Sequence, residues 1–192
     1  MFVVKYSGPF GFIKPWTAVR DSETFSQQFL TPSIIEGIEK KLFPELLKEK
    51  GIHKIKRHRL RYKQMAAQQE QIQPRGWNKK KNHYERPYAI LTRSVMIEPE
   101  LLVAFDNSDD ANEASKQHIC LCRNEDIVYP DENILEIAEK EFDTNEDLFS
   151  GFELIFIKSD QSFLVGYNRM NDNIPMYGYI KIVGHPVRRN YE

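Results

Sequence analysis

The sequence predicts an α+β fold, because one amphipathic helix is embedded among segments with the composition of β-strands. Residues 31–43 carry apolar side chains at helical spacing, so one helix face should pack on a sheet and leave Glu39, Lys40 and Lys41 in water. Hydrophobic residues make up 41% of the 192 positions, which is enough to build a core. We therefore expect a single domain over residues 1–192.

The predicted helix has clear start signals. Thr31 or Ser33 can accept hydrogen bonds from the first free N–H groups, and Pro32 suits the first turn. Glu36 lies three residues after Ser33, which is the spacing of a capping box. Before the helix, residues 2–7 are predicted to form a strand that ends in a glycine-containing turn.

A basic strand is expected over residues 52–65, after the helix. On alternation, Ile55 shares one face with Arg57, Arg59 and Arg61, so neither face is cleanly apolar. This composition predicts an edge strand or a strand that carries a ligand.

The second half of the chain is predicted to contain more strands and one further helix. Strands are expected at residues 89–98, 100–105, 118–123, 152–158, 161–167 and 176–183. Residues 132–142 are predicted to form an acidic helix with Ile134, Leu135, Ile137 and Ala138 facing inward.

The formal net charge of -1 conceals a division along the chain. Residues 48–93 hold 14 Lys and Arg against 3 acids, whereas residues 98–153 hold 3 against 17. A phosphate backbone responds to local charge, within a screening length of about 8 Å, so the basic half predicts a nucleic-acid partner. The alternative is that the two halves pair with each other inside the fold.

Residues 66–86 are predicted to form a mobile basic loop. The segment is rich in Gln and places Trp77 beside Lys79, Lys80 and Lys81. Such a loop can bind phosphates and stack a base, with each stack contributing about 1–3 kcal/mol. A solvated linker would need no aromatic residue, so we favour a binding role.

Motifs for nucleotide-driven or hydrolytic chemistry are absent from the sequence. Cys120 and Cys122 are too close along one strand for an unstrained disulfide and lack partners for a zinc site, so we expect neither a metal nor a cofactor. The first residues resemble a strand rather than a signal peptide, and no apolar run is long enough to cross a bilayer. We expect a cytoplasmic protein without a membrane partner.

Lys116 and His118 are the candidates for catalysis. A metal-free ribonuclease needs a group that exchanges protons near neutral pH and a cation that stabilises the phosphorane, and His and Lys could supply them. The alternative is that both lie at the exposed end of a strand.

Three segments carry a resemblance to a known family. They are Ser-Gly-Pro-Phe-Gly-Phe-Ile-Lys-Pro at residues 7–15, Leu-Thr-Pro-Ser-Ile-Ile-Glu-Gly-Ile-Glu at residues 30–39, and Tyr-Glu-Arg-Pro-Tyr-Ala-Ile-Leu-Thr-Arg-Ser-Val-Met-Ile-Glu at residues 84–98. In this order they resemble the fifth CRISPR-associated (Cas) protein family, nearest the type I-C subgroup, over residues 2–105.

The resemblance implies a four-stranded ferredoxin-like (RRM-like) sheet of the RAMP (repeat-associated mysterious protein) class. Residues 66–86 would be its basic loop extension and residues 106–150 an acidic variable region. Family members hold the 5′ handle of the CRISPR RNA (crRNA) in Cascade, a type I surveillance complex of antiviral defence. The implied partners are crRNA and the backbone and large subunits of Cascade, with target DNA as a further candidate.

Members of the type I-C subgroup also cut precursor crRNA without a metal ion, using a Tyr and an adjacent Lys-His pair. Phe43 matches the Tyr, and Lys116 and His118 match the pair with Gln117 between them. Because a phenyl ring has no hydroxyl, we expect binding without cleavage. The alternatives are a metal-independent endoribonuclease and an inhibitor that imitates the subunit and docks through its acidic face.

Eleven residues are expected to bind RNA. Arg57, Arg59, Arg61 and Lys63 would contact phosphates, Trp77 and Tyr84 would stack bases, and Lys79, Lys80, Lys81, Arg86 and Arg93 would bind the handle or adjoining DNA. The acidic half would dock on a basic neighbouring subunit.

Overall fold

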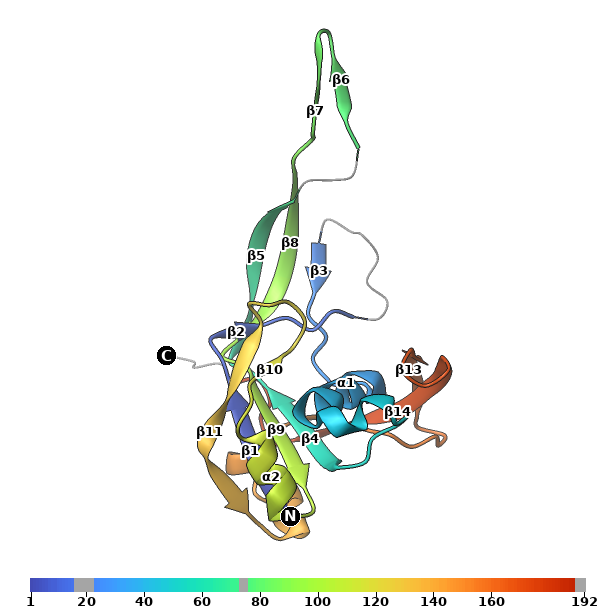
Figure 1. Ribbon diagram of the computed structural model, residues 1–192. Coiled ribbons are helices and arrows are strands. Elements are labelled where there is room, and N and C mark those ends of the chain that lie inside the picture. Colours follow the sequence, from blue (N-terminus) through green and yellow to red (C-terminus); the bar gives the residue numbers. More distant parts are fainter. Residues whose placement is uncertain (16–22, 73–75, 189–192) are drawn as a thin grey trace.

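An antiparallel sheet of eight strands forms the body of the protein (Figure 1). The computed structural model describes residues 1–15, 23–72 and 76–188. In spatial order the strands are β10 (Ile119–Cys120), β11 (Ile127–Glu136), β1 (Phe2–Ser7), β9 (Glu100–Phe105), β4 (Ile55–Arg61), β12 (Gly151–Ile155), β14 (Ile174–Val183) and β13 (Phe163–Asn168). The chain therefore has the expected α+β fold, although its sheet has eight strands where four were predicted.

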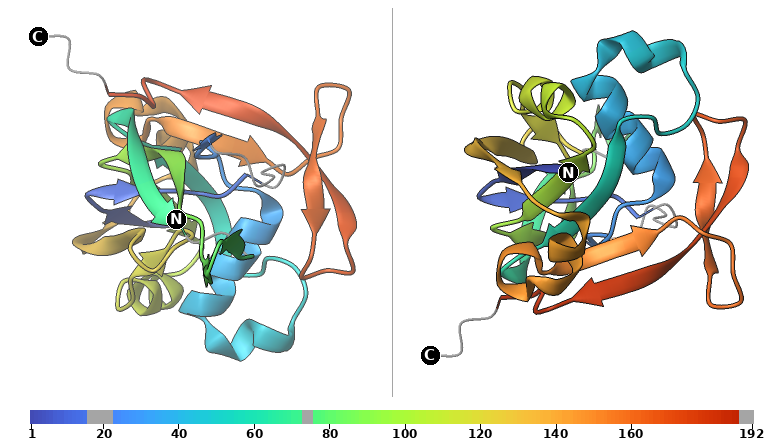
Figure 2. Two further views of the ribbon diagram at one scale, coloured as in Figure 1. Left: turned by 90° about the horizontal axis from the view of Figure 1, so that it is seen from above. Right: turned by 90° about the horizontal axis from the view of Figure 1, so that it is seen from below.

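Helices cover both faces of this sheet (Figure 2). One face carries α1 (Pro32–Leu42), the following 3-10 helix η1 (Pro44–Lys48) and α2 (Ser108–Ala114), and the other carries α3 (Glu139–Thr144) and α4 (Glu146–Phe149). Alternation along β1 serves both sides, since Val4 packs in the α1 cluster and Val3 packs against the α3–α4 side. None of the described helices could cross a membrane, because the longest has 11 residues.

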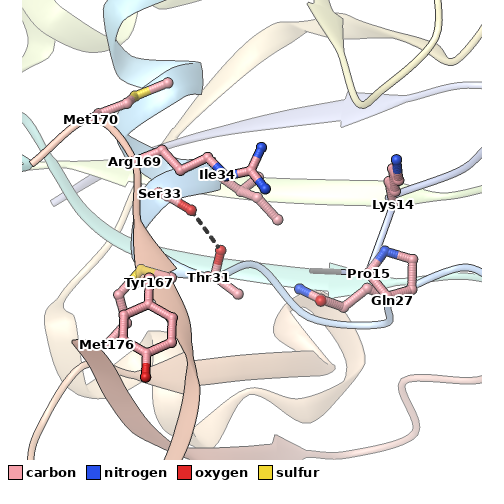
Figure 3. A pocket seen from close by; sticks show the side chains of 10 residues that line it. All are labelled: Lys14, Pro15, Gln27, Thr31, Ser33, Ile34, Tyr167, Arg169, Met170 and Met176. Carbon is pink, nitrogen blue, oxygen red and sulfur yellow. Dashed lines mark hydrogen bonds between the residues drawn. The ribbon is translucent and has the colours of Figure 1, made fainter. Parts of the chain in front are cut away.

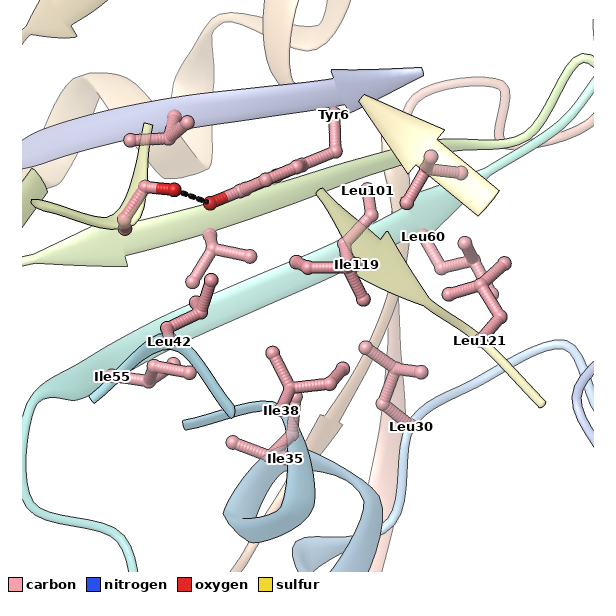
Figure 4. Packing of buried hydrophobic residues seen from close by; sticks show 14 of the residues in the cluster. Tyr6, Leu30, Ile35, Ile38, Leu42, Ile55, Leu60, Leu101, Ile119 and Leu121 are labelled. Carbon is pink, nitrogen blue, oxygen red and sulfur yellow. Dashed lines mark hydrogen bonds between the residues drawn. The ribbon is translucent and has the colours of Figure 1, made fainter. Parts of the chain in front are cut away.

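The main core lies between α1 and the sheet (Figure 4). Ile35, Ile38 and Leu42 project from α1 toward Leu60 and neighbouring strand residues, and all are nearly or fully buried. Each such side chain contributes about 1.5–3 kcal/mol through burial. The predicted helix and its apolar face are confirmed.

The helix starts as predicted, with Thr31 as its N-cap residue and Pro32 in the first turn, but the predicted side-chain caps are not formed. The hydroxyls of Thr31 and Ser33 lie 3.3 Å from each other, and neither caps the helix. Glu36 is buried and accepts hydrogen bonds from Lys40, the Gly51 N–H and Asn168. A capping box is therefore not formed.

Glu39 is fully buried, although it was predicted to face water. Its carboxylate accepts the backbone N–H groups of His53, Lys54 and Ile55 at 2.8, 2.6 and 2.7 Å. The charged group is therefore compensated, and it holds the chain that enters β4 against α1.

A second sheet forms a long arm that projects from the body (Figure 1). Its centre is β8 (Ala89–Ile97), which pairs with β5 (Gln64–Ile72) along all nine residues and with the short strands β2 (Phe10–Gly11) and β3 (Glu23–Phe25). A small hairpin of β6 (Asn78–Lys80) and β7 (His83–Glu85) forms the tip. The predicted mobile loop at residues 66–86 is therefore wrong for its described part; residues 73–75 lie outside the described ranges.

Two other predictions are overturned. The basic strand β4 is central, between β9 and β12, rather than at an edge. A bulge between Ile55 and Arg57 also turns Ile55 to the α1 side, away from the arginines. The acidic segment 132–142 is mainly the end of β11, and its helix begins only at Glu139.

Candidate nucleic-acid interface

The three arginines of β4 lie on the α3–α4 side of the sheet, where they form a buried ionic cluster. Arg59 is fully buried and donates to Glu153 at 3.1 Å, to Asp143 at 2.5 Å and to the carbonyl oxygens of Phe142 and Phe149. These bonds fix α3 and α4 on the sheet.

The neighbouring arginines of β4 are held in the same way. Arg57 donates to both oxygens of Glu153 and to Asp143 at 2.5–2.8 Å. Arg61 donates to Glu100 at 2.6 and 2.8 Å and to Ser150 at 3.0 Å. The geometry does not support the phosphate contacts predicted for Arg57, Arg59 and Arg61, because their donors are used inside the protein.

The cluster also shifts the pKa values of its members. Burial alone would raise the pKa of Asp143, but hydrogen bonds from Arg57 and Lys181 outweigh it and hold that pKa well below its usual range. The hydrogen bond to Glu153 raises the pKa of Arg57. Asp143 and Arg57 are therefore both charged at neutral pH.

Part of the charge division along the chain is therefore internal. Further ion pairs join Lys54 to Asp110, Lys56 to Asp106 and Lys63 to Glu98 at 2.9–3.0 Å. The alternative that the basic and acidic halves pair inside the fold describes the segment around β4.

The tip of the arm carries exposed aromatic and basic side chains. Trp77 and Tyr84 are 59% and 62% exposed, and the guanidinium carbon of Arg86 lies 4.9 Å from the centre of the Trp77 ring. Lys79 lies opposite Tyr84 in the β6–β7 register, while Lys80 pairs with Glu85 at 2.7 Å. The tip thus offers aromatic surfaces beside cations.

The remaining predicted RNA-binding residues lie in different places. Lys81 is exposed beyond β6, at the tip. Lys63 is at the root of the arm, and its ion pair with Glu98 leaves its side chain 37% exposed. Arg93 lies on β8, bonded to Glu70 at 3.0 Å and 5.2 Å from the centre of the Phe12 ring, which is typical of a structural contact.

A pocket of about 310 Å³ opens at the base of the arm (Figure 3). It lies between the start of α1, the β13–β14 hairpin and the chain that leaves β2 and β3. The side chains of Lys14, Gln27, Ser33, Tyr167 and Arg169 are among those that line it.

Sequence reasoning missed this pocket. Lys14 and Arg169 are isolated cations in distant parts of the sequence, so local charge counting finds neither. The only signal was the Thr-Pro-Ser segment at residues 31–33, of which Thr31 and Ser33 line the pocket.

The candidate catalytic residues are exposed. Lys116 pairs with Glu113 at 2.7 Å, and the His118 ring lies 5.9 Å from that of Tyr129. The segment lies against the end of α1, because Gln117 donates to the Leu42 carbonyl at 3.4 Å. Phe43, in the position matched to a catalytic tyrosine, is fully buried against Phe105 and has no hydroxyl.

No group of three or more His, Cys, Asp or Glu gathers as a metal site within residues 1–15, 23–72 and 76–188.

The architecture is that of an α+β protein with a mostly antiparallel sheet, few helices and a projecting basic hairpin. Among solved structures it is similar to a chain of a CRISPR RNA-guided surveillance complex, with a TM-score of 0.53 and 10% sequence identity. The match covers 95% of this chain and 89% of that chain, so the two share a fold. Neither a protein-family model nor a curated protein matches the sequence.

Proposed function

We propose that the protein is a cytoplasmic RNA-binding subunit of a type I Cascade-like complex, in which it holds the 5′ handle of the crRNA. The observation that carries the proposal is the tip of the arm, where Trp77 and Tyr84 are exposed beside Lys79, Lys80 and Lys81. Exposed rings stack unpaired bases while cations bind the backbone. The fold supports the same proposal, because it is shared with a chain of an RNA-guided surveillance complex.

The test is a triple charge reversal of Lys79, Lys80 and Lys81 to Glu. RNA affinity should fall strongly, and the slope of log affinity against log salt should flatten by up to about 2, since each lost phosphate contact removes about 0.7 for a single strand. Unchanged affinity and slope would show that the tip does not touch RNA.

A matched control is reversal of three exposed lysines away from the arm, namely Lys48, Lys140 and Lys158. This variant has the same net charge. Its RNA affinity should stay well above that of the tip variant, because only the tip lysines are proposed to contact phosphates.

The nuclease alternative has a direct test. Incubation of the protein with its cognate repeat RNA in EDTA should give no cleavage, because Phe43 is buried and lacks a hydroxyl. Cleavage that disappears in His118→Ala would instead establish a metal-independent endoribonuclease. The inhibitor alternative is tested by sequencing RNA that co-purifies with the native complex: a repeat-derived 5′ end supports the handle-binding proposal, and an RNA-free complex supports the inhibitor.

A further inference from the structure

The pocket at the base of the arm carries an excess of positive charge. Lys14 and Arg169 both line it, and none of its lining side chains in the described ranges is acidic. Neither cation has an ion-pair partner among the described residues. By contrast, Lys50 is paired with Asp172 at 2.5 Å on a nearby turn. Two uncompensated cations at one opening favour a phosphate group.

The same pocket offers contacts for a base. Tyr167 is 52% exposed and presents an aromatic ring at the opening (Figure 3). Gln27 is nearly buried, and its amide nitrogen donates to the Phe29 carbonyl at 2.8 Å, so its amide oxygen is the group that can accept from a ligand. An aromatic face beside a fixed polar group is typical of sites that bind unpaired bases.

The volume and the position of the pocket restrict the class of ligand that it can hold. A volume of about 310 Å³ is at the lower end for ligand pockets, about 300–1,000 Å³, and suits one nucleotide rather than a duplex. Lys14 follows β2 and Gln27 follows β3, and both strands belong to the sheet of the arm. A single strand bound at the tip can therefore continue along the arm to the pocket.

We propose that this pocket binds one nucleotide of the single-stranded guide RNA, with its phosphate on Lys14 and Arg169 and its base on Tyr167. The inference rests on the proposed RNA-binding function and adds a second contact point, separate from the tip of the arm. The two points together fix the path of the strand between them.

The experiment uses the RNA recovered from the native complex as probe. Lys14→Gln combined with Arg169→Gln should lower affinity at least about tenfold and flatten the salt slope by about 1.4, since each contact accounts for about 0.7. The control is Lys48→Gln combined with Lys140→Gln, which removes the same charge from other exposed sites and should leave both quantities unchanged.

Stacking is tested at Tyr167. Tyr167→Ser should weaken binding about 5- to 150-fold, and Tyr167→Phe should restore it, because the ring and not the hydroxyl is needed. Probe RNA carrying 4-thiouridine should crosslink to Tyr167.

The outcomes separate the two proposals. If the tip variant loses RNA while the pocket variants behave like their control, the pocket inference is overturned and the proposed function stands. If the wild-type protein binds no RNA, both are overturned. A reduced slope in the pocket variant together with the Tyr167 crosslink supports the inference.

Discussion

Replacement of Arg59 by Met tests whether the β4 arginines stabilise the fold or bind RNA. Arg59 is fully buried, and Met keeps a similar length while removing every donor. Glu153 and two backbone carbonyls then lose a partner in a site without solvent. Breaking a buried ion pair from one side costs about 3–5 kcal/mol.

The expected effect is large enough to measure by calorimetry or circular dichroism. At about 2–4 °C per kcal/mol for a protein of this length, Tm should fall by about 6–20 °C. Lys63→Met is the control, because its ion pair with Glu98 is exposed and contributes about 0–1 kcal/mol.

Two results would refute the reasoning. One is a Tm decrease no larger than that of Lys63→Met. The other is a selective loss of RNA affinity by Arg59→Met, measured at a temperature at which the variant is folded. Either result would return Arg59 to the phosphate-binding role that the sequence predicts.

Two further predictions concern pH and assembly. Burial lowers the pKa of His58 from 6.5 to about 4. Because the unfolded chain then takes up the proton first, the free energy of unfolding should fall by up to about 3 kcal/mol as pH drops from 6.5 to 4. In urea denaturation between pH 6.5 and 5, His58→Leu should reduce this dependence of stability on pH, and the same dependence in the variant and the wild type would contradict the prediction. Reversal of the exposed Glu132, Glu136 and Glu139 to Lys should reduce co-purification with basic partner subunits, while RNA binding by the isolated protein persists. Loss of RNA binding with unchanged co-purification would instead assign the acidic surface to RNA.

Sequence predicts an element well when its buried residues recur at a regular spacing along the chain. The apolar spacing of α1 identified both the helix and its buried face. The same spacing failed for Ile134 and Leu135, which fit a helical face but pair with Val4 and Val3 as part of β11. That strand forms because the edge of β1 needs a partner, which no local pattern reveals.

The candidate nucleic-acid interface could be predicted only where it depends on local composition. Exposed Lys and aromatic residues at the tip of the arm are neighbours in sequence, so their clustering was visible. The basic stripe of β4 looked the same, but its acidic partners Asp143 and Glu153 lie more than 80 residues away. Burial and pairing are tertiary properties, and they decide whether a basic strand faces RNA or an internal carboxylate.

The arm is attached to the body through its two long strands, β5 and β8, which continue the neighbouring strands β4 and β9 of the central sheet. β5 follows β4 within three residues, and β8 leads into β9 through Glu98, whose φ of 48° marks the bend. Side chains alternate between the two faces of a strand every residue, so the pattern repeats every two residues. Deletion of two residues from each of β5 and β8 would therefore shorten the arm by about 7 Å and keep the remaining side chains on their present faces. The length of the arm can thus change in steps of one pleat, with no change to the core.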